Sequence, residues 1–242
     1  MSLYLSRFLL NPCSRQVRSE IAHPYEMHRT LMRGFPEATD AAKAKARDEY
    51  GVLFRAEVDD VVKVYVQSLV EPNWSFLSDL DDYLCAHADV PKNIMPAYQE
   101  LQKGQLLAFR LRANPTKRVA KDDDAMKGKR VALRREDDQI AWLIRKGQER
   151  EKGVPGGFAL LTNDVKDVRG EVRLVPCVNI YPGGKQTGRK RDTTREHATT
   201  HVAVVFEGIL RVTDANAFQE TLIHGIGSAK AFGFGLLSVA PR

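Results

Sequence analysis

Tyr25 and His28 are spaced so that they could act together on a phosphate ester. They are three residues apart in a predicted helix over residues 24–35, and side chains three apart share one helix face. Pro24 is a typical first helical residue, so the pair would lie near the first turn, where the helix dipole attracts phosphate. An imidazole exchanges protons near neutral pH, whereas a phenol keeps its proton there. The pair suits proton transfer at a phosphate, although such a pair is more often simply packed or exposed.

Arginines flank this pair. Arg29 and Arg33 are four residues apart, and Arg33 follows His28 by five. Arginine stays protonated and can bind phosphate through two hydrogen bonds, so Arg33 is a candidate for stabilising charge on a reacting phosphate. Arg15 and Arg18, in the preceding short helix, would extend the same basic patch as phosphate-binding residues together with Arg29. A solvated helix face explains these arginines equally well.

A glycine-rich run over residues 225–238 has four glycines and one lysine within eleven positions, and it continues into an apolar strand. Glycine lets successive backbone N–H groups point outward and form an anion-binding concavity. Lys230 adds a positive charge, and Phe232 and Phe234 could anchor the loop in a core or stack on a base. Neither a Walker A motif nor a dinucleotide fingerprint fits, because the first needs Gly-Lys-Ser/Thr and both precede a helix. We predict RNA-backbone binding, with a purely structural turn as the alternative. The residues assigned to binding are Gly227, Lys230, Gly233 and Gly235.

The net charge of +6 is concentrated in three stretches. Residues 1–35, 115–135 and 185–195 carry +3, +5 and +4, so the remainder of the 242-residue chain carries −6. This polarity favours a polyanion on one face, although three solvated loops pointing different ways would give the same values. The RNA-binding candidates in the last two stretches are Lys117, Arg118, Lys129, Arg130, Lys185, Arg189, Lys190 and Arg191. The cluster around residues 117–130 could instead face a partner subunit.

The composition, 43% hydrophobic and 28% charged, is typical of a soluble globular protein. The three cysteines, Cys13, Cys85 and Cys177, are far apart and indicate a reducing compartment rather than disulfides or a metal centre. The apolar residues 3–10 are interrupted by Arg7 and are too few for a signal peptide or a membrane span. We therefore expect a cytoplasmic protein that does not enter a membrane.

Two clusters of potential metal ligands give only weak evidence for a metal site. Residues 122–124 are all aspartate, but Lys121 and Lys127 flank them and a solvated loop is the simpler explanation. His197 and His201 are four apart, a spacing that suits zinc on a helix but not in the strand expected here. We expect no metal and no cofactor.

The elements that must position these residues alternate between strands and helices. Asn11-Pro12 is predicted to cap and open the first helix, and His23-Pro24 to end it and open the second. In the first half we predict strands at residues 3–10, 52–58, 61–69 and 105–112. The helices predicted there are 14–21, 24–35 and, weakly, 74–85. This β-α-β-β-α-β order is that of a ferredoxin-like fold.

A similar order follows in the second half. The predicted strands are residues 130–134, 158–161, 172–181, 201–213 and 234–239, with a basic turn at 182–191. The predicted helices are an amphipathic one at 137–150 that carries Ile140, Trp142, Leu143 and Ile144, and one capped by Asp214 that ends at His224. We predict an α+β fold of two tandem ferredoxin-like domains, residues 1–118 and 119–242, with antiparallel sheets and helices on one face.

Four sequence blocks, in order from the first strand to the last, resemble the CasE family, the CRISPR repeat endoribonucleases of the type I-E Cascade complex. The blocks are residues 4–12, 23–31, 109–118 and 225–238. The resemblance implies RRM/RAMP-type domains that bind the repeat hairpin of pre-crRNA and cut its base without a metal. It further implies that the mature crRNA is retained with the other Cascade subunits, and that the isolated chain is a monomer.

By this resemblance His28 is the catalytic histidine, acting as general acid or base, and Tyr25 positions or exchanges a proton with the attacking 2′-hydroxyl. Arg33 occupies a position where the family has a basic residue. His23-Pro24 departs from the family's usual Asn-Pro or Asp-Pro, which leaves open whether His23 shares the proton transfer. A non-catalytic scaffold that binds an RNA hairpin is the alternative of a different class, and a metal-dependent nuclease is another.

Overall fold

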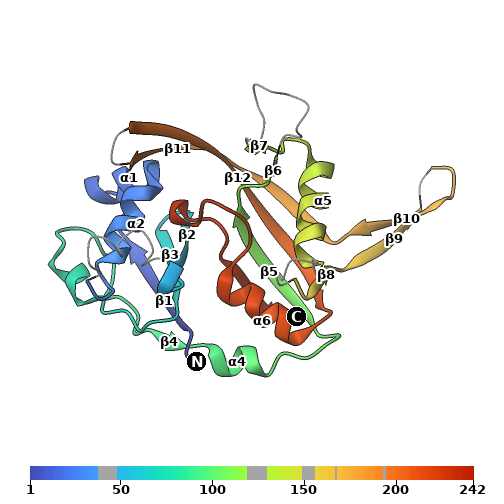
Figure 1. The fold of residues 1–242 in the computed structure, drawn as a ribbon, viewed down its shortest axis with the longest axis horizontal. Helices are drawn as coiled ribbons and strands as arrows, with labels where there is room; N and C mark the ends of the chain where they lie inside the picture. The colour runs from blue at the N-terminus through green and yellow to red at the C-terminus, as the bar shows by residue number, and fades with distance from the viewer. Residues whose placement is uncertain (38–47, 119–129, 149–155, 167, 193–194) are drawn as a thin grey trace. The chain divides into compact units, whose positions relative to one another are not determined.

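The computed structural model describes residues 1–37, 48–118, 130–148, 156–166, 168–192 and 195–242. Its chain divides into two compact units (Figure 1). Unit 1 comprises residues 1–100, 185–201 and 228–236, and unit 2 comprises residues 101–184, 202–227 and 237–242. The domain boundary at residue 118 stays a prediction. No helix among the described residues is long and apolar enough to span a membrane.

Unit 1 contains a sheet with the spatial order β2-β3-β1-β4, in which all neighbours are antiparallel. Its strands are β1 (Tyr4–Leu10), β2 (Leu53–Val58), β3 (Val62–Ser68) and β4 (Lys92–Asn93). Helices α1 (Arg15–Ala22) and α2 (Pro24–Met32) connect β1 to β2, and the 3₁₀ helix η1 (Ser75–Asp79) lies between β3 and β4. The short helix α4 (Met95–Gln99) follows. The order and the connections are those of a ferredoxin-like module.

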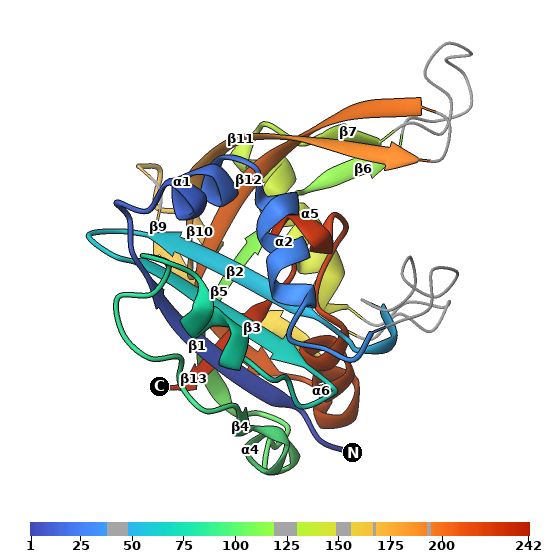
Figure 2. The same cartoon turned by 90° about the vertical axis from the view of Figure 1, so that its left-hand side faces the viewer.

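The core of unit 1 follows from strand alternation. Phe8 lies opposite Val64 and Leu10 opposite Val62, and all four side chains are buried on one face of the sheet. Helices α1 and α2, drawn beside this sheet in Figure 2, cover that face with their own apolar residues. The helical residues in this core include Val17, Met27 and Leu31.

The two helices begin differently. α1 starts at Arg15, because Ser14 is its N-cap and accepts a hydrogen bond from the Val17 amide (3.5 Å). The Asn11 side chain instead accepts from the Cys13 amide (2.9 Å), and its carbonyl accepts from the Ser14 amide, so Asn11-Pro12 forms a turn before the helix. The prediction that this dipeptide opens α1 is wrong. α2 begins at Pro24 as predicted.

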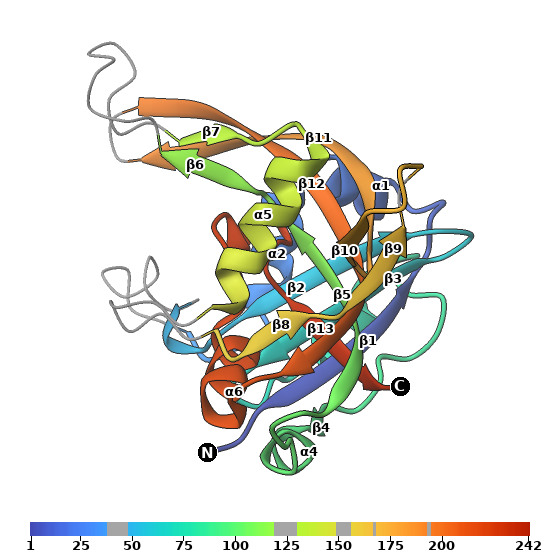
Figure 3. The same ribbon diagram turned by 90° about the vertical axis from the view of Figure 1, so that its right-hand side faces the viewer.

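Unit 2 repeats the ferredoxin-like order. Its sheet runs β11-β12-β5-β13, and β8 also pairs with β12. The elements are β5 (Leu106–Ala113), α5 (Glu136–Gly147), β8 (Phe158–Leu160), β11 (Val178–Asp192), β12 (Arg195–Val212), α6 (Ala215–His224) and β13 (Leu237–Pro241). Helices α5 and α6 lie along the sheet in Figure 3, with Trp142 stacked on Phe206 (6.1 Å between ring centroids) and Phe218 edge-on to Phe158. Of the apolar residues of α5, Trp142 and Leu143 are buried, whereas Ile144 is 37% exposed.

The strand predicted at residues 105–112 was assigned to the wrong module. It is β5, which pairs with β12 and β13 and so opens the second sheet rather than closing the first. The first sheet is closed by β4, whose two residues, Lys92 and Asn93, are exposed and show no apolar alternation. The strand predicted at 130–134 is β7 (Arg130–Ala132), which forms a separate ribbon with β6 (Thr116–Arg118).

The basic residues 182–191 do not form a turn. They belong to β11, which lies beside β12 in the sheet, and residues 193–194 between the two strands lie outside the described part of the chain. A second pair of strands, β9 (Thr162–Lys166) and β10 (Val172–Pro176), forms its own antiparallel ribbon.

Candidate functional site

Tyr25 and His28 share one face of α2, as predicted. Their ring centroids are 5.8 Å apart, and the His28 ring stacks on Phe54 of β2 at 6.3 Å with the planes 8° apart. His28 is buried (9% exposed) and Tyr25 is half-buried. Because Met27 and Leu31 pack into the core beside His28, they fix the rotation of α2 about its axis. The imidazole is therefore held in place, while the phenol remains partly accessible.

The glycine-rich loop packs against this pair. Between α6 and β13 the chain forms the 3₁₀ helix η2 (Lys230–Phe232), whose Phe232 ring lies 5.7 Å from the Tyr25 ring and 4.6 Å from the His201 ring. Positive φ angles, which favour glycine, occur at Gly225, Gly227, Ala229, Gly233 and Gly235. The fully buried Phe234 anchors the loop. Residues 228–236 and the Tyr25–His28 pair therefore form one site in unit 1.

Arg55 of β2 anchors the end of the loop. Its side chain is 5% exposed, and its Nη1 donates a hydrogen bond to the Leu236 carbonyl (3.4 Å). Its Nε is 2.8 Å from Oε1 of Glu57, two residues along the strand and on the same face. Sequence reasoning missed Arg55, although a basic and an acidic residue two apart within an apolar strand is a detectable signal.

His201 is a second imidazole near the loop, to which sequence reasoning assigned no role. Its spacing from His197 suits a zinc pair on a helix but not in the strand that was expected; His201 does belong to β12, and its ring packs on Phe232 and Phe234. Burial lowers the pKa of His201, which keeps the ring neutral at pH 7. The His197 side chain and residues 122–124 lie outside what the structure describes. Among the described residues, no group of three or more His, Cys, Asp or Glu could hold a metal ion.

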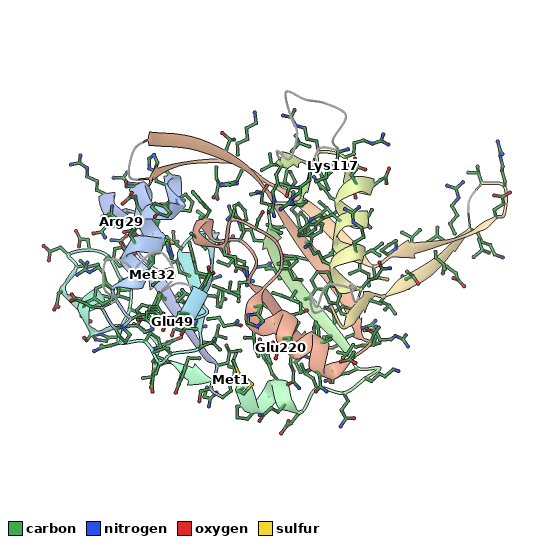
Figure 4. The ribbon with its side chains drawn as sticks, in the orientation of Figure 1. Met1, Arg29, Met32, Glu49, Lys117 and Glu220 are labelled. Atoms are coloured by element: carbon green, nitrogen blue, oxygen red, sulfur yellow. The ribbon has the colours of Figure 1, made fainter. Side chains whose placement is uncertain are left out.

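The four predicted arginines meet in a groove of about 990 Å³ between α1 and α2. Arg15 and Arg18 come from α1, and Arg29 and Arg33 follow from α2 and its end; all four are exposed. Figure 4 labels Arg29 on the surface of α2, where it pairs with Glu26 at 2.9 Å. Arginines lie on both walls of the groove, and guanidinium groups can bind the phosphates of an RNA backbone. Four carboxylates, those of Glu20, Glu26, Asp81 and Asp82, also line it.

The three residues predicted to be catalytic, Tyr25, His28 and Arg33, do not share one face of α2. Residues five apart are separated by about 140° around a helix axis. Arg33 accordingly lines the groove, where its guanidinium carbon is 4.5 Å from the Phe76 ring centroid, whereas His28 faces Phe54. Stabilisation of the scissile phosphate by Arg33 stays a prediction.

The remaining basic candidates lie on strands. Lys117, labelled in Figure 4, and Arg118 are exposed on β6, and Arg118 lies directly opposite the exposed Arg130 of β7. Lys185 is exposed on β11. Lys129, and the side chains of Arg189, Lys190 and Arg191 on β11, lie outside what the structure describes. Their binding roles stay predictions.

Comparison with known proteins identifies the family. A family model described as "CRISPR associated protein" matches residues 3–241, so the chain belongs to this family. Over 99% of its length it is 39% identical to the CRISPR-associated endoribonuclease Cse3 of Thermus thermophilus, and over 99% it is 30% identical to the CRISPR system Cascade subunit CasE of Escherichia coli. Both relatives are covered completely. The resemblance inferred from the four sequence blocks is confirmed.

Solved structures agree with the fold. The chain matches CRISPR endoribonuclease Cse3 bound to a 19-nt RNA with a TM-score of 0.74, 38% identity and complete coverage of both chains. It matches Thermus thermophilus Cse3 bound to an RNA representing a pre-cleavage complex with a TM-score of 0.70 and 37% identity, again over both complete chains. Together with the strand orders of the two sheets, these matches confirm the predicted tandem ferredoxin-like fold.

Proposed function

We propose that this chain is a metal-independent endoribonuclease that cleaves CRISPR repeat hairpins in pre-crRNA and then retains the mature crRNA within a type I-E Cascade complex. The observation that carries the proposal is the Tyr25–His28 pair in the first turns of α2, packed against a glycine-rich loop. A protein that only binds RNA has no need of an imidazole and a phenol at this place.

The chemistry needs no external nucleophile. The RNA 2′-oxygen attacks the adjacent phosphorus and the bond from phosphorus to the 5′-oxygen breaks, leaving a 2′,3′-cyclic phosphate and a free 5′-hydroxyl. One proton leaves the 2′-hydroxyl and one reaches the departing 5′-oxygen. His28 acts as the general acid or base in this exchange, and Tyr25 positions the 2′-hydroxyl or exchanges a proton with it.

Binding is separate from the chemistry in this proposal. The α2 N-terminus and the glycine-rich loop, with its Lys230 side chain, bind the phosphate at the cleavage site. Within the loop the Phe232 and Gly233 amides donate to the Ala229 and Lys230 carbonyls, which holds the shape of the loop. The arginine groove and the basic residues of β6, β7 and β11 contact the backbone of the hairpin and its flanks. The two named relatives support the proposed function as a whole, since one is described as an endoribonuclease and the other as a Cascade subunit. Location in the cytoplasm, a monomeric state in isolation and contacts with the other Cascade subunits are parts of the same proposal.

Cleavage of a labelled cognate repeat hairpin in EDTA tests the proposal. We expect wild type to cut, and His28→Ala to cut about 10²–10⁴-fold more slowly while still binding. His23→Ala is the matched control, because this exposed imidazole lies five residues earlier, with Nδ1 3.1 Å from the Ser19 carbonyl of α1. It should cut at the wild-type rate. Thermal unfolding of each variant separates loss of chemistry from loss of fold.

Two outcomes contradict the proposal. If wild type cuts only with a divalent ion, the metal-dependent alternative holds. If wild type binds the hairpin tightly but never cuts it, the chain is a scaffold subunit. A His23→Ala variant as slow as His28→Ala would move the proton transfer to both histidines.

A further inference from the structure

One carboxylate lies at the base of the arginine groove. Glu20 of α1 lines the groove but is only 3% exposed. Its Oε1 accepts hydrogen bonds from the Thr30 hydroxyl of α2 (2.6 Å) and the Gln16 side-chain amide of α1 (2.9 Å). Its Oε2 accepts from the Tyr83 hydroxyl, in the segment after η1. A single side chain thereby connects three segments of unit 1.

These donors remain protonated across the physiological range. Burial, and next the charge of Glu20, raise the pKa of Tyr83, so its hydroxyl stays a donor. The Thr30 and Gln16 groups do not titrate. Because a buried carboxylate is costly unless its oxygens accept hydrogen bonds, the network defines one position for Glu20.

Little else fixes α1. The only buried residues within this eight-residue helix are Val17 and Glu20, whereas α2 buries Pro24, Met27, His28, Thr30 and Leu31. Apolar contact is non-directional, so the packing of Val17 and of the partly buried Ile21 against the core does not by itself fix the rotation of α1. Hydrogen bonds have preferred directions, and those of Glu20 set the angle of α1 against α2. That angle decides whether the α1 arginines face those of α2.

We propose that Glu20 is a positioning residue for RNA binding, which holds α1 so that Arg15 and Arg18 contact the same backbone as Arg29 and Arg33. The inference rests on the proposed function, because it assumes that the groove binds RNA. It assigns Glu20 no contact with the RNA. Glu20 acts through the two α1 arginines alone.

The test measures how binding of the repeat hairpin to the full-length protein depends on salt. Each phosphate contact contributes about 0.7–0.9 to the slope of log K against log salt. Glu20→Leu, which keeps the helix but removes every acceptor, should lower the slope by roughly 1.4–1.8 units, equal to the loss in the Arg15→Gln/Arg18→Gln double variant. In the Glu20→Leu background, the two arginine changes should lower the salt slope no further. Glu20→Gln should restore the slope, because its amide can accept from Thr30 and donate to the Tyr83 oxygen.

The outcomes distinguish the alternatives. A wild type that binds the hairpin without salt dependence overturns the proposed function together with this inference. A Glu20→Leu slope equal to wild type, or arginine losses that simply add to it, overturns the positioning role alone. Tighter binding by Glu20→Gln with an unchanged slope would make Glu20 a counter-charge instead. Thr30→Val removes the bond that crosses from α2, and it should give a smaller loss of slope at a measured Tm close to wild type.

Discussion

Replacing Arg55 should destabilise the protein strongly, because this arginine forms a buried ion pair on β2. Arg55 and Glu57 form an ion pair of 2.8 Å with side chains only 5% and 15% exposed, and the guanidinium also lies 5.2 Å from the Tyr65 ring centroid. Removing one partner of a buried pair costs about 3–5 kcal/mol, because the other charge stays in a medium of low polarity. We expect Arg55→Met to lower stability by about that amount, which corresponds to a fall in Tm of roughly 6–20 °C for a chain of this size.

The chain offers a matched control. Arg110 and Glu207 form a shorter pair, 2.6 Å, but their side chains are 43% and 30% exposed. Because exposed pairs contribute about 0–1 kcal/mol, Arg110→Met should barely change the urea or thermal midpoint. Equal losses in the two variants would refute the argument from burial.

A second change isolates the uncompensated charge. Arg55→Met/Glu57→Gln removes both charges, so it should recover part of the stability that Arg55→Met loses. The hydrogen bond from Arg55 to the Leu236 carbonyl is still absent in the double variant. The loop should therefore remain less firmly held, and RNA cleavage should stay below wild type even where stability returns. A double variant less stable than the single one would contradict this reasoning.

Three further predictions concern the same unit. Because burial lowers the pKa of His201, the unfolded chain binds this proton more readily, so the free energy of unfolding should fall as the pH drops below about 6.5. His201→Leu should remove part of the fall in the urea midpoint between pH 7.5 and pH 5.5. An equal fall in wild type and variant would contradict this role of His201. Ala229 has a φ of 63°, so Ala229→Gly should stabilise the protein by up to about 1 kcal/mol. Gly233 has a φ of 75°, so Gly233→Ala should destabilise it by a similar amount in thermal unfolding. Changes of the opposite sign would show that a side chain is not strained in this left-handed backbone geometry. Lys185→Ala should lower the salt slope of hairpin binding by roughly one unit, and an unchanged slope would place this exposed lysine outside the interface.

Helices and strands that are long and strongly periodic were predictable from the sequence, and very short strands were not. β5 is eight residues long and mostly apolar, and its burial alternates along the strand, so its existence was clear. Its partner strands were not, because β4 is two exposed residues whose pairing depends on the rest of the sheet. Asn11-Pro12 resembled a helix start, but Ser14 supplied the cap that the backbone could reach.

The site was predictable where its residues share a helix. The spacing of Tyr25 and His28 is enough to place them on one face of α2, and the same periodicity indicates that Arg33 lies elsewhere. His201 and Arg55 reach the glycine-rich loop from strands far away in sequence. No local pattern encodes such pairings, because they arise only when the sheet and the loop fold together.

The path of the chain through the site has a consequence for biosynthesis. The loop that packs on Tyr25 is made of residues 228–236, which follow the end of α2 at Met32 by almost two hundred positions. A growing polypeptide presents its N-terminal segments first. A nascent or prematurely terminated chain therefore contains the histidine and the phenol but lacks Phe232 and the loop N–H groups. Fragments released by stalled ribosomes before residue 228, or by proteolysis ahead of the loop, should be inactive toward cellular RNA, so the arrangement limits RNA cleavage to chains that already include residues 228–236.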